Sequence, residues 1–295
     1  MEFKFERTLP VRAPYRLDFT VDALRRLAAN IVDIVDQDGC YRRALQDRRG
    51  TNVIEVRQRD ARTLVLRIAG PRAARWVGTV EAMLGTQRDL QPWFRRARAF
   101  PWLAKLATRF RGVHPPRYPT LWEAMAHAIV FQQISIASAS AIMRRAVAQL
   151  SPPVESGGIA YYPFFTPSQL LYSADEPLRA AGLSANKIQH LRSAALAIED
   201  RSITEAMLAK LPSAAAAERL RSVRGIGPWS AAVVLLRGCG RLDVFPLKDS
   251  GVAHSLRLVS GDAQIDADAL LRALGPMKGM LYFHLLLGRM RGPAE

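Results

Sequence analysis

The residues with the clearest capacity for chemistry lie in one stretch, LRSVRGIGPWSAAVVLLRGCGRLDVFPLKD, which covers residues 220–249. Within it, RGIG predicts a tight hairpin turn, because Gly225 and Gly227 lack side chains that would obstruct it. Pro228 follows at the position that proline favours, the first residue of a helix. Backbone N–H groups in such a turn, beside a helix N-terminus, make a site for an anion such as phosphate.

The stretch ends on a carboxylate, Asp249, at the predicted start of the next helix, where its ionised form is favoured. A negative charge beside a phosphate site repels a phosphate-bearing ligand unless it has a task, and stabilising a cationic transition state is such a task. The hydroxyl of Ser230 could add a donor to the anion site. Two simpler interpretations stay open: an ordinary helix–turn–helix corner at RGIG, and an N-cap at Asp249.

The composition favours a polyanionic partner. Over 295 residues, 42 Lys and Arg against 26 Asp and Glu give a net charge of +16, which suits nucleic acid or an acidic membrane surface. Two cysteines exclude a four-cysteine iron–sulfur cluster, and the five histidines show no zinc spacing, so no metal cofactor is indicated. No signal peptide or membrane-length apolar run is present, so we expect a soluble cytoplasmic protein that does not enter a membrane.

Residues 1–112 predict a mixed α/β domain. Strand-like alternation occurs in FKFERTLPV, YRLDFTV, NVIEVRQ and TLVLRIA, and helical stretches are expected near Asp22–Asp36 and Pro71–Leu84. A run from Arg88 to Arg111 is rich in basic and aromatic residues. We prefer to interpret it as an amphipathic helix with a solvated face, and a nucleic-acid contact is the second interpretation. The proline-rich segment HPPRYPT (114–120) marks a domain boundary.

Residues 113–295 predict a mostly helical region. Thr120 and Glu123 suit a capping box, QQIS (132–135) separates two helices, and SPPVESGG (151–158) is expected to be a loop. Later helices are expected at 166–172, 175–181, 185–199, 265–274 and 277–290. The hairpin region adds an N-cap at Ser213 and a left-handed helix end at Gly238.

Taken together, these motifs resemble the helix-hairpin-helix DNA glycosylases, and most closely the 3-methyladenine DNA glycosylase II branch, the AlkA type. The hairpin, the D-x-F-P motif that follows it at 243–246, and Asp249 after that motif match the signature of this family. AIVFQQISIASA (128–139) is similar to the segment that carries the DNA-intercalating wedge, and RAAGLSANKIQHLRSAA (179–195) to the helix–GLS–helix element. The resemblance implies an α+β fold, with an antiparallel sheet in the N-terminal domain and a helical glycosylase region after it.

The resemblance also implies roles for single residues. Asp249 would be the catalytic carboxylate, and Gln133 would take the wedge position that fills the gap left by a flipped nucleotide. Trp229, Val233 and Leu286 would border the base pocket, although the last two stand where the AlkA type has aromatic residues. The expected DNA contacts are Gln133, Arg224, Gly225, Ile226, Gly227, Ser230 and Lys248.

Trp229 also stands where relatives with lyase activity carry a nucleophilic lysine, which implies a monofunctional enzyme. We therefore expect a DNA glycosylase that excises N3- or N7-methylated purines from double-stranded DNA in base excision repair. We expect it to act as a monomer near the nucleoid, with no cofactor beyond a monovalent cation at the hairpin that the resemblance allows. The alternatives are a bifunctional glycosylase/lyase for oxidised bases, a non-catalytic helix-hairpin-helix DNA-binding protein, and an interaction protein with a basic surface.

Overall fold

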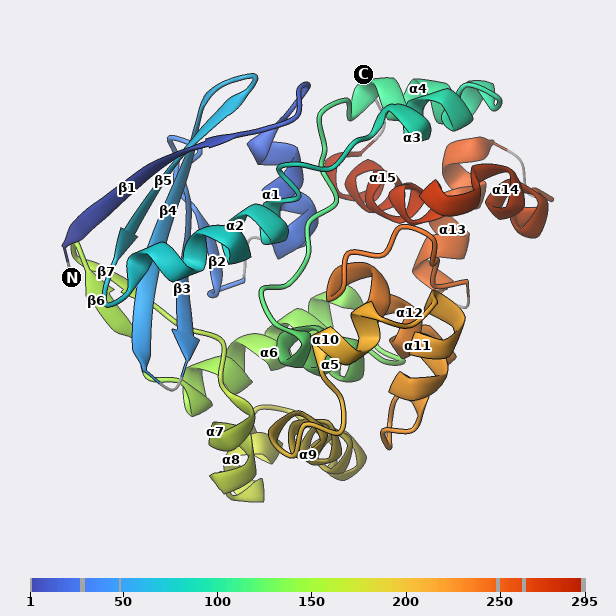
Figure 1. Cartoon of the computed structure of the whole chain (residues 1–295). Helices are drawn as coiled ribbons and strands as arrows, with labels where there is room; N and C mark the ends of the chain where they lie inside the picture. Colours follow the sequence, from blue (N-terminus) through green and yellow to red (C-terminus); the bar gives the residue numbers. More distant parts are fainter. Residues whose placement is uncertain (1, 27–29, 48, 248–249, 262–263, 293–295) are drawn as a thin grey trace.

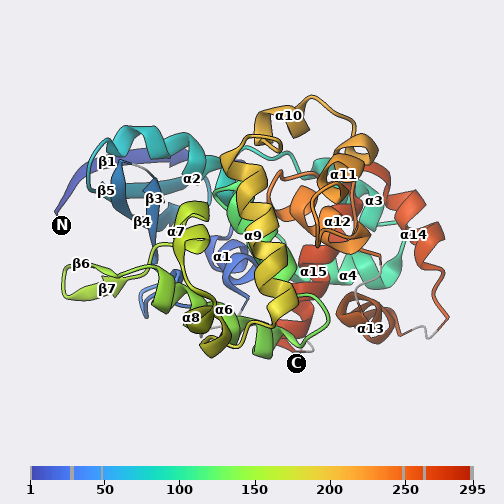
Figure 2. The same cartoon turned by 90° about the horizontal axis from the view of Figure 1, so that it is seen from below.

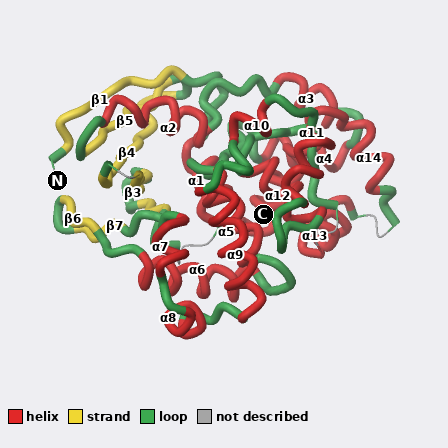
Figure 3. The backbone as a smooth tube through the Cα atoms, turned by 60° about the horizontal axis from the view of Figure 1, so that its bottom comes forward, coloured by secondary structure: helices red, strands yellow, loops and turns green. Residues whose placement is uncertain are grey.

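A computed structural model describes residues 2–26, 30–47, 49–247, 250–261 and 264–292. Strands gather at one end of the molecule and helices make up the remainder (Figure 1, Figure 3). The predicted α+β fold, with an antiparallel sheet before a mostly helical region, is confirmed. No helix among the described residues is long and apolar enough to cross a membrane.

The N-terminal sheet has five antiparallel strands in the order β1-β5-β4-β3-β2. Their bounds are β1 Phe3–Pro10, β2 Asp33–Val35, β3 Tyr41–Asp47, β4 Gly50–Asp60 and β5 Thr63–Ala69. One face packs into the main core with helix α2 (Val77–Leu84), which follows the short 3-10 helix η1 (Ala73–Trp76) and crosses the sheet in Figure 1. Three of the predicted strands and the helix near Pro71–Leu84 are thus confirmed.

The segment YRLDFTV was predicted as a strand, but the structure forms helix α1 (Leu17–Arg25) there. Leu17, Val21 and Leu24 are all buried, and their spacing puts them on one helical face, which packs against the sheet. The helix predicted over Asp22–Asp36 is also wrong beyond Arg25. Arg26 adopts a left-handed φ of 65°, and the chain then enters β2.

A second short sheet lies where a loop was predicted at SPPVESGG. Strands β6 (Val154–Ser156) and β7 (Ile159–Tyr161) form a hairpin. The two residues between them, Gly157 and Gly158, have φ values of 58° and 75°, which suit the tight turn of a two-residue hairpin. The hairpin packs against the second face of the large sheet through Tyr161.

Helix α5 (Leu121–Val130) forms the centre of the helical region and is buried at all ten positions. Around it lie α6 Ile136–Leu150, α7 Pro167–Tyr172, α8 Asp175–Ala180, α9 Ala185–Glu199, α10 Glu205–Ala209, α11 Ser213–Arg221 and α12 Pro228–Arg237. Figure 2 shows α9 in the middle of this region, with α7 on one side and α11 and α12 on the other. The short helix α10, capped by the Thr204 side chain, was not predicted.

The C-terminal helices pack with the basic run of the N-terminal part. Helices α13 (Ser250–Ser260), α14 (Ala267–Leu274) and α15 (Lys278–Arg291), with the 3-10 helix η2 (Gly275–Met277), share one apolar core with α3 (Gln91–Ala97) and α4 (Pro101–Arg109). The run from Arg88 to Arg111 therefore forms two helices with buried apolar faces. The domain division at residues 112 and 113 stays a prediction.

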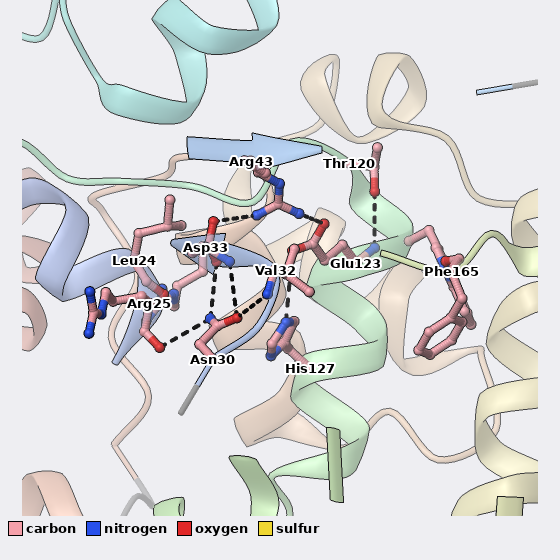
Figure 4. Close-up of polar contacts among 12 residues, drawn as sticks. Leu24, Arg25, Asn30, Val32, Asp33, Arg43, Thr120, Glu123, His127 and Phe165 are labelled. Carbon is pink, nitrogen blue, oxygen red and sulfur yellow. Dashed lines mark hydrogen bonds and ion pairs between the residues drawn. The ribbon is translucent and has the colours of Figure 1, made fainter. Parts of the chain in front are cut away.

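A buried ion network joins the sheet to α5 (Figure 4). Arg43 of β3 is 1% exposed and bonds Asp33 Oδ1 through Nη1 at 2.7 Å, while its Nη2 bonds the carboxylate of Glu123. Thr120 accepts a hydrogen bond from the Glu123 amide at 3.1 Å, so only half of the predicted capping box forms. The Glu123 side chain turns to Arg43 because a buried guanidinium needs a carboxylate partner.

Two expectations for the ends of the hairpin helices were wrong. Ser213 is the first residue of α11, after an N-cap at Pro212, and its hydroxyl accepts a hydrogen bond from Arg241. Gly238 has φ −100° and ψ −47°, outside the left-handed region. A side chain at Gly238 would place Cβ 2.6 Å from Cβ of Ala124, so this glycine allows α12 to approach α5 closely.

The buried His284 predicts a pH dependence of stability. Its Nε2 accepts from Trp93 Nε1 at 3.3 Å and its Nδ1 donates to the Met280 carbonyl at 2.9 Å, and burial lowers its pKa to about 4. The unfolded state takes up the proton near pH 6.5, so stability from this site is lost as pH falls from there towards 4. Between pH 7 and 4.5 we expect urea unfolding to show a loss of about 2–3 kcal/mol from this site.

The matched variant is His284→Leu, which is less stable at neutral pH because Trp93 loses its acceptor. Between pH 7 and 4.5 the variant should lose less free energy of unfolding than the parent does. The difference should equal the contribution of His284, about 2–3 kcal/mol. Equal losses in the two proteins would contradict a neutral His284.

Candidate functional site

The turn between α11 and α12 forms the predicted hairpin. Gly225 has φ +90°, a conformation that other residues rarely adopt, and a Cβ there would lie 2.3 Å from Cγ of His190. Ile226 is 4% exposed and its amide donates to the Val223 carbonyl at 3.0 Å, which anchors the turn in the core. The hairpin is therefore fixed by a backbone that only glycine supports and by a buried isoleucine.

The hairpin leaves backbone donors at the start of α12. Among the described residues, no hydrogen bond is made by the N–H of Gly225 or of Gly227. Gly227 is in an extended conformation with open space where a Cβ would stand, and Pro228 begins α12. Arg224 is exposed beside them. Amides, a helix N-terminus and a guanidinium together could bind an anion here, and the anion site stays a prediction.

Gln132 ties the hairpin to the loop between α5 and α6. Its Nε2 donates to the Gly225 carbonyl at 2.8 Å and to Oγ of Ser230 at 2.7 Å. Lys187 of α9 holds the same loop, because its Nζ donates to the carbonyls of Val130 at 2.7 Å and Gln132 at 3.0 Å. Ser230 is 2% exposed, so its hydroxyl serves this bridge, and its direct contact with DNA stays a prediction.

The α5–α6 loop presents Gln133 at its tip. Gln133 is exposed and has φ +58°, a rare value for a residue other than glycine. Ile134 follows and is also an exposed apolar side chain, at 38%. Ser135 then caps α6 by accepting from the Ser138 amide at 3.1 Å. The structure thus places the predicted wedge residue in an exposed loop whose base is bonded to the hairpin.

The predicted pocket residues lie at different depths. Trp229 is half-buried and packs on the main core, to which the buried Val233 also belongs, whereas Leu286 is 8% exposed in the core of the C-terminal helices. Little of Val233 or Leu286 is accessible to a ligand in this conformation. Lys248 and Asp249, the predicted DNA contact and catalytic carboxylate, lie outside the described residues.

A small cavity that sequence reasoning missed opens between α1, α5 and α6, with a volume of about 20 Å³, close to that of one water molecule. The side chains that give it its character are Arg26, Tyr118, His127, Phe131, Met143 and Arg144. The Arg26 guanidinium lies 4.6 Å from the ring centroid of Phe131 and donates to the hydroxyl of Tyr282 at 3.1 Å. The cavity borders the α5–α6 loop, since Phe131 stands two residues before Gln133.

Cationic and aromatic side chains line this cavity. Burial, reinforced by Arg26, Arg237 and Arg43, holds the pKa of His127 well below its usual value, so the ring is neutral. The His127 ring stacks on Tyr118 with centroids 4.3 Å apart. No sequence signal could have located this cavity, because its residues come from two segments more than 80 residues apart.

No metal site is evident within the described parts of the chain, where no three His, Cys, Asp or Glu side chains gather. The hairpin carbonyls of Val223, Gly225 and Gly227 each accept one hydrogen bond, from Ile226, Gln132 and Ala231. A carbonyl oxygen has a second lone pair, so these groups are compatible with a weakly held monovalent cation. That cation stays a prediction.

Comparison with known proteins identifies the family of the chain. Residues 126–275 match the family described as HhH-GPD superfamily base excision DNA repair protein. The chain is 28% identical over 171 residues to a DNA-3-methyladenine glycosylase of Bacillus subtilis, covering 58% of this chain and 56% of that protein. It thus spans about half the length of the curated relatives it matches.

Two solved structures are similar in fold. A 3-methyladenine DNA glycosylase from Archaeoglobus fulgidus has a TM-score of 0.81 at 24% identity, covering 96% of this chain and 98% of the other. A 3-methyladenine DNA glycosylase of Schizosaccharomyces pombe, in complex with abasic DNA, has a TM-score of 0.57 at 21% identity, covering 70% of this chain and all of the other.

Substitution of the two hairpin glycines by alanine should change the free energy of unfolding by very different amounts. We expect Gly225→Ala to lower the free energy of unfolding by about 2 kcal/mol or more, because alanine disfavours φ +90° and its Cβ would collide with His190. Gly227→Ala should change it by less than about 0.5 kcal/mol, since its φ is ordinary and the space is open. Urea unfolding of the two variants measures the difference, and equal stabilities would contradict this geometry.

Proposed function

The chain belongs to the HhH-GPD superfamily of base excision DNA repair proteins, and we propose that it is a monofunctional DNA glycosylase that removes N3- or N7-methylated purines from double-stranded DNA. The observation that carries this proposal is the hairpin of Gly225–Gly227 bonded through Gln132 to the loop that exposes Gln133. One element offers an anion site and the other a protruding side chain, at a fixed separation.

In this proposal the hairpin binds the DNA backbone. The amides of Gly225 and Gly227 and the dipole of α12 would hold one phosphate, with Arg224 beside it. The net charge of +16 would add a sequence-independent attraction that weakens with salt. The S. pombe relative's complex with abasic DNA supports DNA as the partner.

Base excision requires the damaged nucleotide to leave the helical stack. Flipping costs a few kcal/mol, least where the base is damaged or mispaired. Gln133 would enter the vacated space from the loop tip, and its exposure and left-handed backbone suit that task. The bond from Gln132 to Gly225 would keep the inserted residue in register with the bound phosphate.

The reaction replaces the N-glycosidic bond with a bond from C1′ to a water oxygen. The base leaves with the bonding electrons, positive charge develops on the sugar, and the ionised Asp249 would stabilise that charge and orient or deprotonate the water. A base methylated on N3 or N7 is already cationic and leaves as a neutral molecule, so little acid catalysis is needed. Trp229 would attract such a cation through its ring by about 0.5–2 kcal/mol.

The monofunctional assignment rests on Trp229 at the first turn of α12. An indole cannot form the Schiff base through which a lysine would cleave the strand, so the proposed product is an intact strand with an abasic site. No cofactor is needed for this hydrolysis. We propose that the protein works as a monomer in the cytoplasm, with damaged double-stranded DNA as its partner.

The proposal predicts the outcome of a lesion panel. Duplexes that each carry one defined lesion are incubated with the protein, and abasic sites are then cleaved with alkali. We expect cleavage at 7-methylguanine and 3-methyladenine, and a loss of at least 100-fold in rate for Asp249→Asn, because oxocarbenium stabilisation is removed.

A matched control is Asp243→Asn, an exposed carboxylate in the same loop, which should cleave at the parent rate. Absence of cleavage at every alkylated base would end the proposed function. Parent-like activity in Asp249→Asn would instead overturn the assignment of the catalytic residue alone.

A further inference from the structure

The His190 side chain packs directly against Gly225 of the hairpin. It stands in the second turn of α9, and its Cβ, Cγ and Cδ2 lie 2.5, 2.3 and 2.8 Å from the position that a Gly225 Cβ would take. The imidazole therefore occupies the place of a side chain on the turn that carries the free amides. The conformation of Gly225 and the position of His190 depend on each other.

The two ring nitrogens of His190 have different surroundings. Nδ1 is buried and has no hydrogen-bond partner among the described residues, whereas the residue as a whole is half-exposed. Nε2 makes no hydrogen bond to a described residue and is not among the buried atoms without a partner. Nε2 is thus the nitrogen that faces solvent beside the hairpin, where it can donate to an incoming oxygen.

The charged surroundings of His190 favour an anion. Arg224 of the hairpin raises the local positive potential, and it bonds Oε1 of Gln189 at 3.1 Å, which holds it next to α9. Lys187 lies one turn earlier on α9, but its ammonium group is bonded to two loop carbonyls. Neither element contributes a carboxylate to this group of side chains.

From this geometry we propose that His190 is a further DNA contact, in which its Nε2 donates a hydrogen bond to the phosphate held by the hairpin amides. This inference rests on the proposed function, which identifies the anion as a phosphate of DNA. His190 would act as a binding and positioning residue, not a catalytic one, because it contacts the backbone and not the reacting base or sugar. Its contact adds a side-chain donor from α9 to the amides and the Arg224 guanidinium of the hairpin.

The contact makes DNA binding depend on pH. In the free protein, burial and the Arg224 guanidinium lower the pKa of His190 below its usual value. A bound phosphate favours the protonated ring and raises that pKa, so binding takes up a proton and affinity falls as pH rises. Lys and Arg side chains ordinarily remain charged between pH 5.5 and 8, which leaves histidine as the group that changes there.

The experiment measures binding to a fluorescent duplex that carries a tetrahydrofuran abasic-site analogue, at pH 5.5 and pH 8 and over a series of salt concentrations. For the parent we expect a Kd about three- to tenfold lower at pH 5.5, because binding takes up a proton on His190. The slope of log K against log salt should also be steeper at pH 5.5 by up to about 0.9, the value for one additional phosphate contact.

Two variants test whether His190, and no other group, causes the pH dependence of DNA binding. His190→Gln, a neutral donor of similar reach, should bind with a Kd and salt slope that no longer change with pH. His254→Gln is the matched control, since His254 of α13 is the other exposed histidine in the described part of the chain, and it should keep the parent's pH dependence. A purely structural role for His190 would alter affinity equally at both pH values.

A measurement on the unaltered protein covers the case in which His190→Gln fails to fold. The pKa of His190, followed by NMR of the histidine ring, should rise when the abasic duplex is added. An unchanged pKa, or binding with no pH dependence, overturns this inference and leaves the proposed function in place. Absence of binding to the duplex at low salt at both pH values overturns both.

Discussion

The backbone of Gly225 is the constraint on which the functional site depends. Its left-handed φ turns α11 into α12, and its missing side chain makes room for His190. Its carbonyl accepts the hydrogen bond from Gln132 that fixes the α5–α6 loop. One glycine therefore sets the anion site, the packing of α9 against that site and the position of the loop tip at Gln133.

The surrounding fold holds this assembly through buried polar contacts. Arg237, at the end of α12, is fully buried, and its Nη2 donates to the last carbonyls of α1 at Ala23 and Leu24, at 3.0 and 2.9 Å. Arg43 and Glu123 join the sheet to α5 in the same way. Removal of Arg43 would leave the buried carboxyl groups of Asp33 and Glu123 without the cation they share, so the N-terminal sheet serves as a base for the helices that carry the site.

The sequence predicts the hairpin well because its determinants are local. Gly225 and Pro228 prescribe a turn and a helix start without reference to the rest of the chain. Strand β3 was missed because charged residues interrupt its apolar alternation, and the reason for Arg43 there is a carboxylate 80 residues away. The bond from Gln132 to Gly225 spans 93 residues, and the contact of His190 with Gly225 also joins two separate helical segments. Tertiary packing alone brings these groups together.

The central claim is that the hairpin, the loop tip and Asp249 together hydrolyse one N-glycosidic bond and leave the strand whole. Mass spectrometry of the products from a duplex with a single 7-methylguanine tests it most directly, with borohydride present in a parallel reaction. We expect the free methylated base, an intact strand with a hydrated abasic sugar, and no covalent protein–DNA adduct. A strand cut without alkali, or an adduct trapped by borohydride, would contradict the account.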